Sequence, residues 1–155
     1  MEIGLGHRYK ASVDNITIPT SPSAFDLILL APASNVPIIV DRIVATASVL
    51  TGAILRLVLT RRSATSTGGT ALVPTPSSPA SPSASTGVTY LTTAQGAASG
   101  TPLDSQQWNE FAPYEFNVRP AGELIVPGTW LALSIPAAPA STVTASFTVE
   151  FIEVK

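Results

Sequence analysis

The sequence contains no cysteine and only one histidine, His7. The absence of cysteine excludes a disulfide framework, a thiolate metal site and a cysteine nucleophile. A Ser-His-Asp relay would depend on a single imidazole close to the N-terminus, and zinc would need mostly carboxylate ligands. We therefore expect no catalytic, cofactor-binding or metal-binding residues, no cofactor, and a protein that is not an enzyme.

Charged residues are also scarce. Asp, Glu, Lys and Arg make up 12% of the 155 residues, about half the usual fraction, and the formal net charge is −2. Arg61-Arg62 is an isolated pair, so the basic footprint of a nucleic-acid-binding protein is missing. The mean hydropathy of +0.36 predicts that part of the surface is covered by partner subunits.

Long apolar runs are absent as well. The stretch from Phe25 to Pro32 is too short to cross a bilayer, and Asp26 interrupts it. The first ten residues lack the ordered basic, apolar and small-residue regions of a signal peptide. We expect no membrane contact, and a protein that acts where it is made or travels as part of a larger particle.

What the sequence does contain is a clear strand pattern near the C-terminus, from Thr142 to Val154. The apolar side consists of Val143, Ala145, Phe147, Val149 and Phe151, and the polar side of Thr142, Thr144, Ser146, Thr148 and Glu150. This period of two predicts a strand with one dry face and one wet face. Such a strand belongs to an antiparallel sheet that packs against a second layer.

Further strands are predicted between turn signals along the chain, at 9–18, 25–31, 38–49, 54–62, 88–93, 107–118, 123–126 and 130–135. Asp14-Asn15 is expected to break the first of them, and Pro113 to divide 107–118. Pro127-Gly128 is expected at the tip of a hairpin that joins 123–126 to 130–135.

Within 38–49, one face is predicted to carry Ile39, Ile43, Ala45, Ala47 and Val49, and the other Val40, Arg42, Val44, Thr46 and Ser48. No helix is expected. The predicted fold is all-β, a two-sheet antiparallel sandwich of jelly-roll type. A flexible arm (1–8) is expected to precede a single domain (9–155).

The middle of the chain differs from the rest, because no charged side chain occurs from Ser63 to Leu103. Its first part, 63–86, is rich in Ser, Thr and Ala, and its prolines are spaced so that no regular ladder is expected. Disordered linkers are usually charged. We therefore predict an extended, polyproline-like loop laid on a surface, either its own or that of a neighbour.

Two carboxylates and two aromatic residues are the strongest candidates for chemistry. Glu110 and Glu115 flank an aromatic cluster, as the two carboxylates of a glycosidase do, although they would be rim charges on an ordinary strand. Trp108 and Tyr114 would either stack on a sugar or belong to the core, and the core is favoured.

Other polar motifs indicate structure rather than chemistry. Gly68-Gly69 is followed by neither a lysine nor a helix, so it does not form a phosphate-binding loop. Asp41-Arg42 and Arg61-Arg62 are expected at strand edges, where charge prevents unwanted strand pairing.

The strand ending LVLTRR is followed by STGGTALVPTP, and downstream come ELIVPGTWLALSIPAAPAS and a last strand ending VEFIEV. Together these stretches resemble a family of small tailed-phage virion proteins. The likeness covers about residues 36–155 and consists of turns and strands, not of catalytic signatures. The passage from Pro76 to Ser85 departs from the family, because a few acidic residues would be expected there.

The resemblance implies a capsid decoration, or cement, protein: a jelly-roll domain that forms homotrimers on the exterior of the phage head and clamps neighbouring major capsid proteins. It would be made in the host cytoplasm and reside in the virion. Met1 to Lys10 and Ser63 to Thr86 are the expected intersubunit contacts. The alternatives are a carbohydrate- or receptor-binding module, for which Trp108 or Trp130 would have to be exposed, and a tail or connector component.

Overall fold

The computed structural model describes residues 6–21, 24–49, 54–109, 111–117 and 122–154. These residues form twelve β-strands. None of them belongs to a helix that could cross a membrane. The all-β prediction is confirmed.

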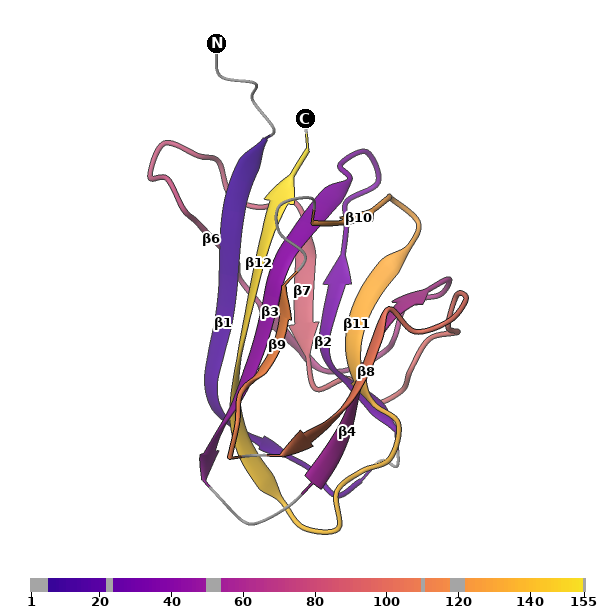
Figure 1. The fold of residues 1–155 in the computed structure, drawn as a ribbon. Helices are drawn as coiled ribbons and strands as arrows, with labels where there is room; N and C mark the ends of the chain where they lie inside the picture. The colour runs from indigo at the N-terminus through magenta and orange to yellow at the C-terminus, as the bar shows by residue number, and fades with distance from the viewer. Residues whose placement is uncertain (1–5, 22–23, 50–53, 110, 118–121, 155) are drawn as a thin grey trace.

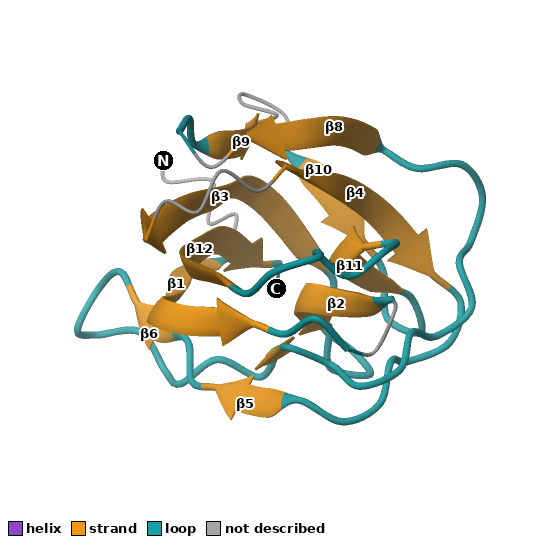
Figure 2. Cartoon of the chain, turned by 90° about the horizontal axis from the view of Figure 1, so that it is seen from below, coloured by secondary structure: helices purple, strands orange, loops and turns teal. Residues whose placement is uncertain are grey.

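The strands form two six-stranded sheets that face each other (Figures 1 and 2). Sheet A has the order β10-β3-β12-β1-β6, with β9 also paired to β3. Its strands are β1 (His7–Ile18), β3 (Ile38–Val49), β6 (Thr75–Pro76), β9 (Tyr114–Asn117), β10 (Glu123–Ile125) and β12 (Val143–Glu153). Sheet B has the order β5-β7-β2-β11-β4-β8. Its strands are β2 (Phe25–Ala31), β4 (Ile54–Arg62), β5 (Thr70–Leu72), β7 (Gly87–Tyr90), β8 (Asp104–Asn109) and β11 (Trp130–Ile135).

The pairing of the main strands is that of a jelly roll. The first strand pairs with the last (β1 with β12), the second with the next to last (β2 with β11), and β4 with β8. Strand β3 pairs with both β9 and β10, which together form one interrupted strand along its edge. All these pairs are antiparallel, as the alternating sequence predicts.

The core lies between the two sheets, and β12 shows how the sequence produces it. Its side chains alternate without exception between buried and half-buried positions from Val143 to Glu153. The apolar set named above is buried and belongs to the same hydrophobic cluster as five residues of sheet B: Leu55, Leu57, Leu59, Leu131 and Leu133. The Tyr9 and Phe151 rings stack with their centroids 5.6 Å apart.

Bulges at Asn15 and at Asp41 change the predicted pattern of sheet A. Asn15 has a φ of 52°, and the register with β12 shifts between Val13 and Ile16, so Asp14-Asn15 forms a bulge within a continuous β1 rather than a break. In β3, Asp41 is the extra residue, because Arg42 is opposite Glu150 whereas Val40 is opposite Phe151. This bulge turns Val40 into the core, so the predicted alternation, with Ile39 inward, is wrong at that end of the strand.

The predicted hairpin at Pro127-Gly128 is also wrong. β10 pairs with β3 in sheet A, whereas β11 pairs with β2 and β4 in sheet B. The turn itself forms: Thr129 N donates to Val126 O at 3.1 Å, and Gly128 has a φ of 82°. Proline followed by a glycine of positive φ is the pattern of a type II turn. This turn carries the chain from one sheet to the other.

The N-terminal arm and the proline-rich loop differ from their predicted bounds. β1 begins at His7, so His7 and Arg8 belong to the strand and not to an arm of residues 1–8, whose first five residues lie outside the described part. The loop 63–86 contains two short strands, β5 and β6, where no ladder was expected. β5 extends sheet B at β7 and β6 extends sheet A at β1. The loop therefore lies on the protein's own surface.

Candidate functional site

The outer face of sheet B carries a buried ion pair between Asp26 of β2 and Arg62 at the end of β4. Arg62 Nε lies 3.0 Å from Asp26 Oδ2 and Arg62 Nη2 lies 2.5 Å from Oδ1, so the pairing is bidentate. The side chains are 0% and 4% exposed, respectively. A bulge in β2 contributes to this arrangement, since Asp26 is opposite Ser134 of β11 whereas Ile28 is opposite Leu133.

Hydroxyl groups complete this pair, and we call the set Asp26, Arg62, Ser66, Thr92 and Ser134 the Asp26–Arg62 cluster. Ser134 Oγ donates to Asp26 Oδ1 at 2.7 Å and Ser66 Oγ donates to Oδ2. Asp26 N donates to Thr92 Oγ1 at 2.9 Å. Both carboxylate oxygens therefore have two partners each, which a buried charge needs in order to be tolerated.

The cluster attaches the charge-free segment, residues 63–103, to the sheet. Ser66 and Thr92 belong to this segment, and Arg62 Nη1 donates to Gly96 O at 2.6 Å. Gly68 and Gly69 have φ values of 72° and 89°, and they bring the chain into β5. A Cβ atom at Gly68 would lie 2.2 Å from Thr93 Oγ1, so glycine is required for the close approach of the two chain passages.

A second buried carboxylate fixes the far end of the proline-rich loop. Glu153 of β12 is 3% exposed and accepts hydrogen bonds from Ser85 N at 2.7 Å, Ser85 Oγ at 3.0 Å and Thr86 N at 2.6 Å. Tyr9 Oη donates to Pro82 O at 3.1 Å. Burial, and to a smaller degree the charge of Glu153, raises the pKa of Tyr9.

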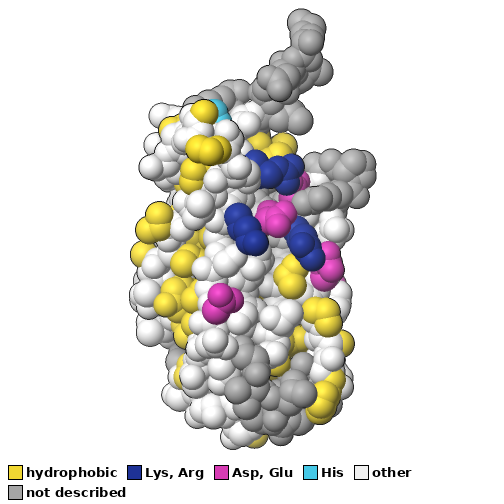
Figure 3. Space-filling view, turned by 90° about the vertical axis from the view of Figure 1, so that its left-hand side faces the viewer, with side chains coloured by type: hydrophobic (Ala, Val, Ile, Leu, Met, Phe, Trp, Pro, Cys, Tyr) yellow, Lys and Arg dark blue, Asp and Glu magenta, His cyan; other side chains and the backbone are white. Residues whose placement is uncertain are grey.

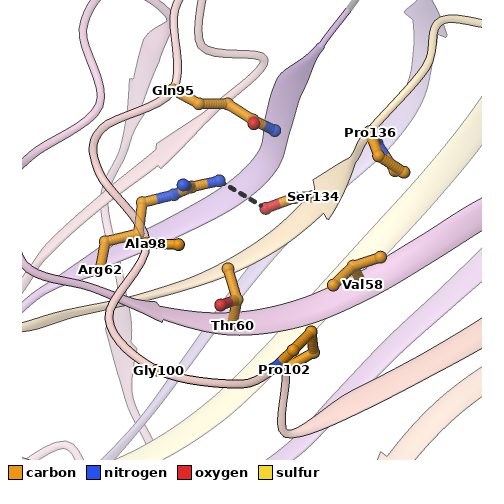
Figure 4. A pocket seen from close by; sticks show the side chains of 9 residues that line it. All are labelled: Val58, Thr60, Arg62, Gln95, Ala98, Gly100, Pro102, Ser134 and Pro136. Carbon is orange, nitrogen blue, oxygen red and sulfur yellow. Dashed lines mark hydrogen bonds between the residues drawn. The ribbon is translucent and has the colours of Figure 1, made fainter.

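A pocket of about 200 Å³ opens beside the Asp26–Arg62 cluster (Figure 4). Its apolar wall consists of Val58, Ala98, Pro102 and Pro136. Its polar side chains are Thr60, Arg62, Gln95 and Ser134, and Figure 4 shows the hydrogen bond between Arg62 and Ser134. The pocket thus combines residues of β4 and β11 with residues of the charge-free segment.

The outer face of sheet A is different, because charged side chains gather on it (Figure 3). Lys10, Glu150 and Arg42 are cross-strand neighbours on β1, β12 and β3. Ion pairs join Arg8 to Asp41 and Arg42 to Glu115 within sheet A. A third ion pair joins Arg61 of β4, in sheet B, to Glu123 of β10, in sheet A. Asp41 and Arg62 are both buried, so the prediction that the two charged dipeptides lie at strand edges is wrong: β3 and β4 are interior strands.

The predicted pair of carboxylates, Glu110 and Glu115, is only half described, because Glu110 lies outside the described residues. Glu115 is exposed on β9 and accepts a hydrogen bond from Arg42 Nε at 3.0 Å. His7 lies in β1, where its Nδ1 is 3.0 Å from Ser81 Oγ. Among the described residues, no group of three or more His, Asp or Glu side chains is placed to hold a metal ion.

The candidate aromatic platform is part of the interior. Trp108 is 3% exposed and its Nε1 donates to Ala112 O at 2.8 Å, while Tyr114 is 2% exposed and its Oη donates to Asp104 Oδ2 at 2.9 Å. Burial, followed by the hydrogen bond and charge of Asp104, raises the pKa of Tyr114. The preference for the core is confirmed for both residues. Trp130 is half-buried.

Comparisons with known proteins add no family. No protein-family model matches the chain, and no curated protein matches it. Among solved structures, a chain of "Structure of infectious bursal disease virus Gx strain" aligns with 96% of this chain at 13% sequence identity and a TM-score of 0.15. The aligned region spans 38% of that chain. A TM-score this low carries no argument about fold or function.

Proposed function

We propose that the protein is a structural component of a tailed-phage virion that binds the exterior of the capsid as a homotrimer. In this role it bridges neighbouring major capsid proteins and stabilises the shell. The resemblance of residues 36–155 to phage decoration proteins motivates the proposal, and the jelly-roll sandwich is the fold that this resemblance implies.

The observation that carries the proposal is the way the charge-free segment is fixed. The Asp26–Arg62 cluster holds one part of it and Glu153 holds another, so an uncharged surface is presented in one conformation. Val73, at the turn between β5 and β6, is 83% exposed on this surface. A surface ordered in advance loses little conformational entropy on binding. Repeated weak contacts on a symmetric lattice then add up to durable attachment.

The test uses expanded phage capsids that lack the protein. We expect the purified chain to bind them to saturation and to raise the temperature at which they open. A Val73→Ser/Pro79→Ser variant should fold normally but bind with lower occupancy, because it changes only exposed residues of the 63–86 loop. Thr148→Ala, on the outer face of sheet A, is the matched control.

Purified tails provide the comparison for the tail or connector alternative. Saturable binding to tails without binding to capsids would replace capsid decoration by that function. Absence of binding to both would refute the proposal.

A further inference from the structure

The polar side chains of the pocket beside the Asp26–Arg62 cluster are already used within the protein. Arg62 is paired with Asp26, and Ser134 Oγ donates to the same carboxylate. Gln95 Nε2 donates to Phe25 O at 3.0 Å. The charge of Arg62 is thus neutralised where it borders the pocket. What the lining offers to a ligand is mainly apolar surface.

The size of the pocket suits one small apolar group. Its volume is about 200 Å³, and an apolar cavity of about 150 Å³ is enough to hold benzene. Pockets for drug-sized ligands begin at about 300 Å³. Val58, Pro102 and Pro136 supply apolar wall, as Figure 4 shows. A branched or aromatic group of the size of one side chain therefore matches the pocket better than a larger molecule does.

A positive charge lies at the rim of this pocket. Arg56 is exposed, and it is on the same face of β4 as Val58, two residues away. Its Nε donates to Ser105 Oγ at 3.1 Å. Ser105 is the cross-strand partner of Val58 and not of Arg56, so this hydrogen bond draws the guanidinium towards the level of Val58. Pro102, three residues before Ser105, is itself part of the pocket wall.

Arg56 has no counter-charge among the described residues, because none of their carboxylates forms an ion pair with it. Asp104, the neighbour of Ser105 in β8, is opposite Leu59 on the other face of the sheet, where its Oδ2 accepts from Tyr114 Oη. Within the described part of the chain, Arg56 makes its hydrogen bond through Nε and none through its Nη groups. These Nη groups are suited to bind a carboxylate.

We propose that the pocket binds an apolar carboxylate. The branched or aromatic group fills the pocket, and the Nη groups of Arg56 bind the carboxylate at the rim. Two sources share this chemistry: a free organic acid, and the apolar C-terminal residue of another polypeptide. In both, the carboxylate is close to the apolar group, which matches a guanidinium held at the level of Val58. This binding site goes beyond the proposed function and does not depend on it.

The test is an NMR titration of the isolated protein with phenylacetate and phenylacetamide, which have the same ring and differ in charge. In the wild type, the amide resonances of Val58, Ala98 and Gly100 should shift with both probes. Phenylacetate should bind at least about 10-fold more tightly, because its carboxylate forms charge-assisted hydrogen bonds with Arg56.

A third probe, N-acetylphenylalanine, distinguishes the two sources, because it resembles the end of a polypeptide. If it binds at least as tightly as phenylacetate, the ligand is a C-terminal residue. If phenylacetate binds and N-acetylphenylalanine does not, the ligand is a free acid.

Arg56→Gln is the decisive variant, because Arg56 is exposed and the fold does not depend on it. This variant should keep its affinity for phenylacetamide and lose the 10-fold preference for phenylacetate. Arg42→Gln, which removes an arginine from the outer face of sheet A, should keep the preference. Ala98→Phe fills the pocket from its wall and should bind neither probe, with thermal unfolding as the check that it folds.

Three results would overturn the inference: equal affinities of the wild type for phenylacetate and phenylacetamide, an unchanged preference in Arg56→Gln, or pocket resonances that shift with neither probe up to its solubility limit. These measurements contain no capsids, so their failure leaves the proposed function as it stands. Failure of capsid binding likewise leaves the carboxylate site.

Discussion

At the scale of single residues, Asp26 is the side chain that the local sequence explains least. It interrupts an apolar strand, which the sequence shows, but its partner Arg62 is 36 residues away. Ser134, which donates to the same carboxylate, is 108 residues away from it. No local pattern connects these positions, and the adjacent arginine, Arg61, offers an equally good sequence match. Only the packing of β2, β11 and β4 brings the cluster together.

Breaking the Asp26–Arg62 pair should destabilise the protein strongly. Asp26→Ala leaves a buried guanidinium without its carboxylate, and we expect a loss of about 3–5 kcal/mol in the free energy of unfolding. The measurement is denaturant-induced unfolding. The exposed Arg42–Glu115 pair is the control, because Arg42→Ala should cost no more than about 1 kcal/mol. If Asp26→Ala and Arg42→Ala cause the same small loss in the free energy of unfolding, the Asp26–Arg62 cluster does not hold the charge-free segment in place.

Tyr114 should make stability depend on pH in the alkaline range. Its pKa is raised above the ordinary value of 10.0 by burial and by Asp104. The folded protein therefore keeps the phenol proton where the unfolded chain releases it, so this stabilisation is full below pH 10 and declines as the pH rises above it.

Tyr114→Phe tests this dependence, since it removes the ionisation. The variant should lose the hydrogen bond to Asp104 at neutral pH and show a smaller further decline above pH 10. Unfolding curves at several pH values measure both effects, and Tyr90→Phe is a suitable control because Tyr90 is only half-buried. If the free energy of unfolding declines equally above pH 10 in the wild type and in Tyr114→Phe, the prediction is contradicted.

At the scale of elements, the strands were predictable and their partners were not. β12 alternates so regularly that its two faces could be assigned from the sequence alone. The bulge at Asp41 reverses the faces of β3 over a few residues, and no periodic pattern shows a bulge in advance. β10 and β11 look like the arms of a hairpin, because a type II turn fits both a hairpin and a connection between sheets. The interaction of β10 with β3 decides between the two.

Glu153 should control the order of the loop it holds. In Glu153→Ala, the amides of Ser85 and Thr86 lose their acceptor, and an unsatisfied buried donor costs about 1–3 kcal/mol. We expect faster amide hydrogen exchange over residues 77–86 than in wild type, with exchange in β2 and β11 changed much less. Glu115→Ala, which removes an exposed carboxylate, should leave this region as it is. Uniformly faster exchange across both sheets would show that Glu153 supports the whole fold instead.

At the scale of the whole molecule, the two outer faces differ in chemistry. Sheet A presents mutually paired charges, whereas the outer side of sheet B is bordered by a segment without any charge. The sequence indicated this division, because all charged residues lie before Ser63 or after Leu103. It did not indicate that the segment would join both sheets through β5 and β6, since those strands are too short to produce a pattern.

The pairing of β1 with β12 has a consequence for how the protein is made. His7 is the partner of Glu153, so sheet A joins the two ends of the described chain, which lie close together in Figure 1. Contacts that span almost the full length of a chain slow its folding. During translation β1 leaves the ribosome long before β12 and has no partner in sheet A on that side until β12 follows. Its apolar side chains are therefore exposed to aggregation throughout that interval.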